Sequence, residues 1–176
     1  MRFHFPVIII DEDFRSENAS GLGIRALAKA IEGEGMEVLG VTSYGDLSSF
    51  AQQQSRASAF ILSIDDEEMA NEGEETIAEL RAFVQELRLR NKEIPIFLHG
   101  ETRTSRHIPN DVLRELHGFI HMFEDTPEFI GRYVVREAKS YLDSLPPPFF
   151  RALVHYASDG SYSWHCPGHS GGVAFL

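Results

Sequence analysis

Two groups of acidic side chains, each placed directly after a short apolar run, are the first candidates for chemistry. They are Asp11, Glu12 and Asp13 after residues 6–10, and Asp65 and Asp66 after residues 59–64. If both runs are neighbouring strands of one parallel sheet, their carboxyl ends meet at one edge, where ligands of such sheets bind. Carboxylate oxygens there could hold Mg²⁺ or accept a phosphoryl group. The alternative is that these acids only mark exposed strand ends, where carboxylates are common.

A second candidate group lies near the C-terminus. His165, Cys166 and His169 are possible soft-metal ligands, and Gly171 and Gly172 could let a phosphate approach the backbone. Neighbouring residues rarely bind one zinc ion together, a fourth ligand is not evident, and no helix is predicted after the two glycines. The residue types therefore favour a packed segment that leads into a strand, with no metal bound.

The spacing of apolar residues predicts the elements that must position these groups. Predicted strands are residues 6–10, 37–42, 59–64, 94–98 and 118–122. Predicted helices are residues 24–31, 46–54, 110–116 and 127–142; Gly33 and Gly35 close the first, and Thr126 caps the last. A further helix, between the third and fourth strands, has Glu74 and Glu75 in its first turn. Its apolar face consists of Ile77, Leu80, Val84 and Leu87. This alternation predicts an α/β fold, a doubly wound five-stranded parallel sheet of the flavodoxin or response-regulator type.

The overall charge limits the possible partners. The chain of 176 residues has a formal net charge of −11 at pH 7. It therefore lacks the general positive field that attracts nucleic-acid phosphates or anionic lipids. Its most apolar run, residues 5–10, is far shorter than the roughly 20 residues of a membrane-spanning helix, and no leader with a cleavage site precedes it. We therefore predict a cytoplasmic protein whose partners include neither nucleic acid nor membrane.

The acidic groups and the predicted sheet together resemble the receiver domain of bacterial response regulators over residues 3–142. In that family an acidic pair holds magnesium and an aspartate after the third strand accepts a phosphoryl group. A working receiver also has Ser or Thr at the end of strand four and Lys after strand five. Here His99 and Gly100 end strand four, and Glu124 and Asp125 follow strand five. We therefore expect a vestigial acidic cluster on a receiver-like scaffold that has lost phosphoryl transfer.

The stretch from Asp65 to Glu75 contains seven acidic residues and no basic residue. Such a run is usually a solvated loop and helix start. The functional alternative is a contact surface on which repulsion opposes association at neutral pH. In that case association should strengthen as the pH falls or as salt screens the charges.

The composition changes after Leu145, and the new segment carries the most specific resemblance. Its motifs are Leu145-Pro146-Pro147-Pro148-Phe149-Phe150-Arg151, Tyr162-Ser163-Trp164, and Pro167-Gly168-His169 followed by Gly171-Gly172. Together they resemble the linker of the large bacterial ornithine/lysine/arginine decarboxylases, which depend on pyridoxal phosphate. The segment from Glu124 to Ile130 is similar to the same family. The sequence around Phe175 is more similar to the arginine-specific branch of that family.

This resemblance implies a receiver-like wing domain over residues 1–143, followed over residues 144–176 by the linker and the start of the catalytic domain. The family motif residues in the linker are Trp164, Pro167, Gly168, His169, Gly171 and Gly172. The family's cofactor lysine lies in a Ser-x-His-Lys motif, which Lys29, Lys92 and Lys139 do not match. The resemblance therefore implies that the chain binds no cofactor and is a fragment or truncated relative that does not catalyse alone.

The implied partners are the catalytic domain of the parent enzyme and further copies of it, as a homo-oligomer in which dimers associate further. The alternative reading is a free-standing pseudo-receiver that acts as a signalling or interaction module. A small independent enzyme built on the acidic cluster is the third possibility. The residues of this chain leave all three open. The substrate pocket of the family lies outside the sequence, so the choice among the basic amino acids stays open as well.

Overall fold

The computed structural model describes residues 3–43, 57–64, 66–100, 107–121 and 124–145, with only the backbone described at residues 3–4 and 66–72. Five parallel strands form one sheet in the order β2-β1-β3-β4-β5. They are β1 (Phe3–Ile10), β2 (Met36–Val41), β3 (Ala59–Ser63), β4 (Ile96–Gly100) and β5 (Gly118–His121). The predicted doubly wound sheet is thus confirmed.

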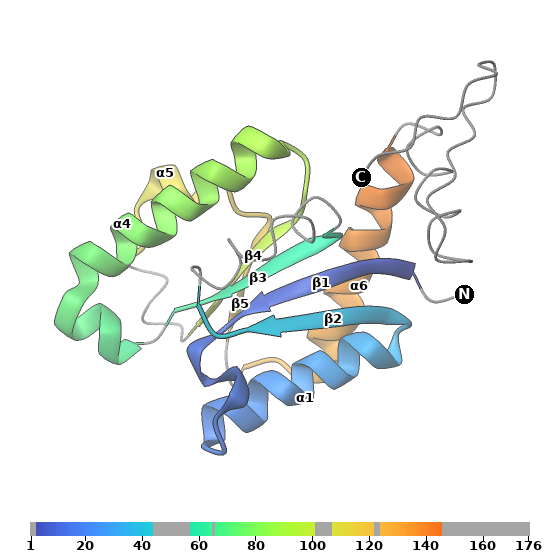
Figure 1. Ribbon diagram of the computed structural model, residues 1–176, viewed down its shortest axis with the longest axis horizontal. Helices are drawn as coiled ribbons and strands as arrows, with labels where there is room; N and C mark the ends of the chain where they lie inside the picture. The colour runs from blue at the N-terminus through green and yellow to red at the C-terminus, as the bar shows by residue number, and fades with distance from the viewer. Residues whose placement is uncertain (1–2, 44–56, 65, 101–106, 122–123, 146–176) are drawn as a thin grey trace, which may run out of the picture.

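Helices cover both faces of this sheet. The helical elements are η1 (Glu12–Arg15), α1 (Ala19–Gly33), α4 (Asp66–Arg90), α5 (Asn110–Leu113) and α6 (Pro127–Ser144). Figure 1 shows α1 and α6 on one side of the sheet, with α4 and α5 on the other. Because both faces are covered, β1, β3 and β4 are apolar on both faces, and Ile8, Phe60 and Phe97 are fully buried among them. Burying each such side chain stabilises the fold by about 1.5–3 kcal/mol.

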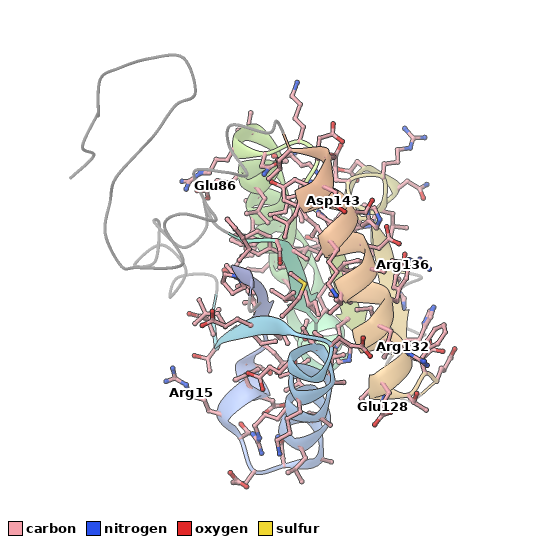
Figure 2. All side chains as sticks on the ribbon, turned by 90° about the vertical axis from the view of Figure 1, so that its right-hand side faces the viewer. Arg15, Glu86, Glu128, Arg132, Arg136 and Asp143 are labelled. Atoms are coloured by element: carbon pink, nitrogen blue, oxygen red, sulfur yellow. The ribbon has the colours of Figure 1, made fainter. Side chains whose placement is uncertain are left out.

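Local signals in the sequence fix several helix ends. Thr126 caps α6, since its hydroxyl accepts a hydrogen bond from the backbone N–H of Phe129 at 3.3 Å, and Pro127 occupies the first turn. Gly35 has a φ of 90°, which lets the chain turn sharply after α1 into β2. Figure 2 shows Glu128, Arg132, Arg136 and Asp143 along the outer side of α6. The opposite side of this helix is buried, as its predicted apolar stripe requires.

Two helices have different limits from those predicted. The helix α4 begins at Asp66, so Glu74 and Glu75 lie in its third turn and not in its first. Acidic residues near a helix N-terminus interact favourably with the helix dipole, and glutamate is a good helix former. The helix α5 ends at Leu113 because the next hydrogen bonds, from the N–H of Glu115 and Leu116, reach only three residues back. The helix predicted over residues 46–54 lies outside the described residues.

The two glycines at the start of α1 provide a test of how tightly the preceding turn is packed. A Cβ at Gly21 would lie 2.2 Å from the carbonyl oxygen of Ser16, whereas a Cβ at Gly23 would meet nothing within 4 Å. Gly21→Ala should therefore lower the free energy of unfolding by about 1–3 kcal/mol, while Gly23→Ala should raise it by up to about 1 kcal/mol. Urea unfolding of both variants measures the difference. Equal effects of the two substitutions would contradict this packing.

Candidate functional site

The first acidic group lies in the turn between β1 and α1, which hydrogen bonds hold in one geometry. Asp11 is only 7% exposed, and its carboxylate accepts a hydrogen bond from the backbone N–H of Asp13 at 2.8 Å. The carboxylate of Asp13 accepts one at 2.8 Å from the side-chain amide of Asn18, the residue that caps α1. The short helix η1, which the sequence analysis did not predict, follows from this capping by Asp11. Both carboxylates thus stabilise the turn.

Arg25 on α1 fixes the same turn from the other side. Its guanidinium donates hydrogen bonds to the carbonyl oxygens of Phe14 at 3.0 Å and Ser16 at 2.6 Å. The Phe14 ring packs over β2 at Gly40, where a Cβ would lie 2.0 Å from a ring carbon. The turn that would hold a magnesium ion in a receiver domain is therefore fixed by Arg25 and by the packing of Phe14 against the core.

The remaining predicted residues are only partly visible in the structure. Glu12 is exposed in η1, Asp66 is described only as the first residue of α4, and Asp65 lies outside the described residues. Among the side chains that the structure describes, no three His, Cys, Asp or Glu groups come close enough to hold a metal ion. The linker residues Trp164, Pro167, Gly168, His169, Gly171 and Gly172, and the pair His165 and Cys166, also lie outside that part of the chain. The vestigial cluster and the linker motif thus stay predictions.

The structure adds one buried titratable residue at the same edge of the sheet. His99 on β4 is only 6% exposed and lies beside Ser63 of β3, its register partner. The Ser63 hydroxyl and Nδ1 of His99 are 3.2 Å apart. Desolvation by burial lowers the pKa of His99 from 6.5 to about 4. The ring is therefore neutral at physiological pH.

Sequence reasoning noted His99 only as a departure from the receiver pattern. Its position directly after the apolar residues 96–98, within β4, was the available signal of burial. A neutral imidazole cannot compensate the charge of a transferred phosphoryl group as a lysine would. The acids Glu124 and Asp125 after β5 are exposed. The described edge of the sheet therefore suits a structural role better than phosphoryl transfer.

Comparison with known proteins identifies the family. Residues 19–141 match the Orn/Lys/Arg decarboxylase, N-terminal domain, and residues 147–176 match the Orn/Lys/Arg decarboxylase, major domain. The lysine decarboxylase LdcA of Pseudomonas aeruginosa is 34% identical over 97% of this chain and 23% of its own length. The biodegradative arginine decarboxylase of Escherichia coli is 28% identical over 96% of this chain and 22% of its own length. The chain thus spans less than a quarter of either relative.

Solved structures agree with this assignment. Lysine decarboxylase A from P. aeruginosa superposes with a TM-score of 0.69 at 32% identity, over 95% of this chain and 22% of its own. An orphan response regulator from Helicobacter pylori superposes with a TM-score of 0.51 at 13% identity, over 78% of this chain and 99% of its own, which shows a shared fold alone. The fold is that of a receiver-like α/β domain. The chain belongs to the Orn/Lys/Arg decarboxylase family, and it carries that family's N-terminal domain.

The decarboxylases of this family depend on pyridoxal phosphate, but the lysines of this chain do not fit that cofactor. A lysine that forms a Schiff base is activated in a desolvated or cationic pocket. Lys29 and Lys92 are exposed, and the ammonium of Lys139 donates a hydrogen bond to the carbonyl oxygen of Glu34 at 3.4 Å. None of them follows Ser-x-His. No catalytic step is therefore assigned to this chain through the cofactor.

The buried His99 predicts how stability depends on pH. The unfolded ring takes up a proton near pH 6.5, whereas the folded ring does so only near pH 4. The unfolded state thus binds more protons between these values, and this contribution to stability, about 3 kcal/mol, is complete above pH 6.5 and lost as the pH falls towards 4. We expect His99→Gln to flatten the fall in unfolding free energy between pH 7 and pH 4.5, measured by urea unfolding. An unchanged slope in the variant would show that His99 is not the cause.

The expected loss of receiver chemistry can be tested directly. Because Glu124 and Asp125, and no lysine, come shortly after β5, Asp65 should not take up a phosphoryl group from acetyl phosphate with magnesium. Intact-protein mass spectrometry measures this, with a working receiver domain as the positive control. A mass increase of one phosphoryl group that disappears in Asp65→Asn would show that the site is functional.

Proposed function

We propose that this chain is the assembly domain, together with the entry to the catalytic domain, of a decarboxylase that acts on a basic amino acid. The wing would comprise residues 1–143, and residues 144–176 would be the linker and the start of the catalytic domain. The observation that carries this proposal is the order of the two family matches, with the N-terminal domain at residues 19–141 and the major domain at residues 147–176. A free-standing signalling module would not need the second match.

The reaction proposed for the whole protein is removal of the α-carboxylate as CO₂, with a proton taking its place on the α-carbon. Pyridoxal phosphate supplies the electron sink for this chemistry when it is bound. Each turnover consumes one proton, which suits an enzyme that responds to acid in the cytoplasm. Within the wing, the turn after β1 and the buried edge at His99 stabilise the fold. The role we propose for the wing in the whole protein is assembly.

The proposed substrate is chosen from the sequence near Phe175, which resembles the arginine-specific branch of the family. The relatives reported above act, by their names, on lysine and on arginine. We keep arginine as the proposed substrate. Carbon dioxide release by the whole protein from arginine, lysine and ornithine, compared under equal conditions, tests that choice.

The proposed partners are the catalytic domain and further copies of the same protein. No helix among the described residues is both long and apolar enough to cross a membrane. The net charge of −11 weakens attraction to nucleic acids and to anionic lipids. These properties support the proposed place of action, the cytoplasm, and a role in protein–protein assembly.

The coding sequence provides the decisive test. If the proposal is correct, the reading frame continues past codon 176 with family sequence that includes Ser-x-His-Lys. The 176-residue chain alone should show neither aldimine absorbance nor CO₂ release from the three basic amino acids. A natural stop codon at that point would favour the free-standing pseudo-receiver, and decarboxylation by the isolated chain would contradict the assigned role.

A further inference from the structure

The end of α6 lies at the boundary between two parts of the protein. The helix ends at Ser144, and the match to the major domain begins at residue 147. Consecutive Cα atoms are about 3.8 Å apart, so the first residue of that match lies within about 8 Å of Leu145. The direction in which α6 ends therefore sets where the major domain begins relative to the N-terminal domain.

A hydrogen bond between the two helical layers holds this end of α6. The side-chain amide of Asn91, the first residue after α4, donates to the hydroxyl of Tyr141 in the last turn of α6. Figure 1 shows α4 and α6 on opposite faces of the sheet, so this bond joins one layer to the other. Tyr141 is only 8% exposed. Burial raises the pKa of its phenol, so the hydroxyl stays protonated at physiological pH.

Asn91 is itself held by backbone groups on both sides of it. Its own N–H donates to the carbonyl oxygen of Leu87 at 2.8 Å, which continues the hydrogen-bond pattern of α4 by one residue. Its side-chain oxygen accepts hydrogen bonds from the backbone N–H groups of Glu93 at 3.1 Å and Ile94 at 3.2 Å. With the bond to Tyr141, the oxygen and the nitrogen of the amide are both paired. The amide therefore has one orientation, in which its N–H points at the phenol.

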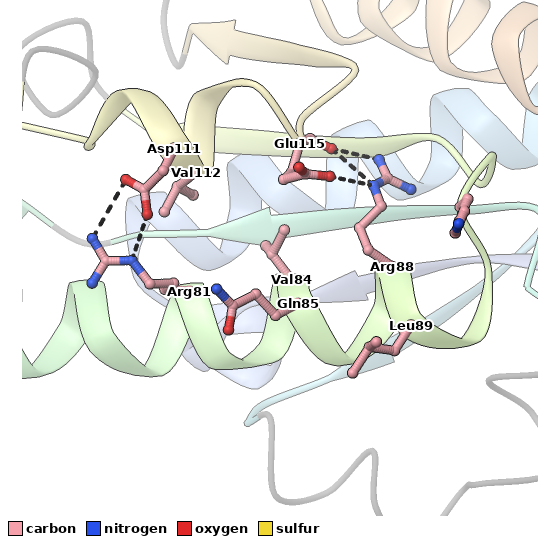
Figure 3. Close-up of a pocket in the computed structure, with 9 residues that line it drawn as sticks. Arg81, Val84, Gln85, Arg88, Leu89, Asp111, Val112 and Glu115 are labelled. Atoms are coloured by element: carbon pink, nitrogen blue, oxygen red, sulfur yellow. Dashed lines mark hydrogen bonds and ion pairs between the residues drawn. The ribbon is translucent and has the colours of Figure 1, made fainter.

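Arg88 fixes the loop that contains Asn91. Its guanidinium donates hydrogen bonds to the carbonyl oxygen of Ile94 at 2.7 Å and to that of Glu115 at 3.2 Å. Figure 3 shows the same guanidinium paired with the carboxylate of Glu115, at 3.5 Å. Hydrogen bonds from a charged donor are among the stronger ones in proteins. The loop between α4 and β4 is thus tied to α4 and to the segment before β5, which makes Asn91 a firm anchor for Tyr141.

The last turn of α6 is also held by its own side chains. Leu142 is buried, and the side chain of Leu145 packs against the core. The hydroxyl of Ser144 donates to the carbonyl oxygen of Tyr141 at 2.6 Å, and the N–H of Leu145 donates to the carbonyl oxygen of Leu142 at 3.3 Å. These bonds satisfy carbonyl groups that the end of a helix otherwise leaves unpaired. The helix therefore ends at a defined residue and in a defined direction.

We propose that Asn91 and Tyr141 are positioning residues, which fix the direction in which α6 ends and thereby the placement of the N-terminal domain on the catalytic domain. Three prolines, at residues 146–148, come directly after this end. Proline fixes φ, and proline-rich segments act as semi-rigid spacers, so we expect the direction of α6 to be passed on to the catalytic domain. This inference rests on the proposed function, because it concerns the whole decarboxylase.

Hydrogen–deuterium exchange of the 176-residue chain tests the contact itself. Tyr141→Phe keeps the buried ring and removes only the hydroxyl. We expect the amides of residues 141–145 to exchange about three- to tenfold faster, while those of residues 130–134 keep their rates. Tyr133→Phe is the matched control on the same helix, because the Tyr133 ring contacts Phe97 and Arg136 without using its hydroxyl. Faster exchange spread evenly over α6, or an equal effect of the control, would overturn the proposed contact.

A double variant tests whether the two residues act through one bond. Asn91→Ala removes the amide that holds both the loop and Tyr141, so it should raise exchange at residues 141–145 at least as much as Tyr141→Phe does. Adding Tyr141→Phe to Asn91→Ala should then cause no further increase, since the shared bond is already lost. Additive effects of the two changes would show that they act separately, which contradicts the pairing.

Distances between spin labels in the whole protein test the positioning role. One label is placed at Glu32→Cys, an exposed position on α1, and the other at a surface cysteine of the catalytic domain. We expect the distance distribution to shift or broaden by several Å in Tyr141→Phe and in Asn91→Ala, and to stay unchanged in Tyr133→Phe. An unchanged distribution in all three variants would overturn the positioning role, even where exchange at residues 141–145 rises. A reading frame that ends at codon 176 would instead contradict the proposed function, so the two failures are distinguishable.

Discussion

Burial of the three central strands on both faces is the constraint on which the rest of this structure depends. The strands β1, β3 and β4 are apolar on both sides, so helices must cover both faces of the sheet. The connections from β1 to β2, from β3 to β4 and from β4 to β5 each include a helix in these layers and return to the same end of the sheet. This geometry gathers the turns after all five strands at one edge. It also separates α1 and α6 from α4 and α5.

At that edge, the described groups that correspond to receiver positions make structural contacts. The carboxylates after β1 accept hydrogen bonds from Asp13 and Asn18, and Arg25 fixes the carbonyl groups of the same turn. At β4 a neutral, buried imidazole takes the place where a receiver has a hydroxyl. Each of these groups has become a structural part of the edge. The comparisons agree, since receivers share the fold at low identity while the decarboxylases share fold and sequence.

Most of the fold could be predicted from the sequence. The start of α4, the length of α5 and the burial of His99 could not. Continuous β-branched runs such as residues 6–10 predict buried strands, and Thr126 with Pro127 predicts the start of α6. The start of α4 at Asp66 was missed because a run of acids is typical of both a solvated loop and a helix N-terminus. The burial of His99 and the short α5 depend on packing from other elements, which local patterns do not contain. The linker was predictable only through its resemblance to a family.

The two helical layers differ in how completely they are packed within one chain. On one face α1 and α6 pack closely, because the missing side chain of Gly131 lets the helices approach at Ala30, where a Cβ would lie 3.0 Å away. On the other face, among the described residues, two arginine–carboxylate pairs, Arg81 with Asp111 and Arg88 with Glu115, join α4 to the α5 segment. A largely apolar flank would make a single chain prone to aggregation. The charged side chains that join α4 to the α5 segment are paired and partly exposed, which avoids that liability. Close packing of small residues thus joins α1 to α6, whereas charge pairs join α4 to the α5 segment.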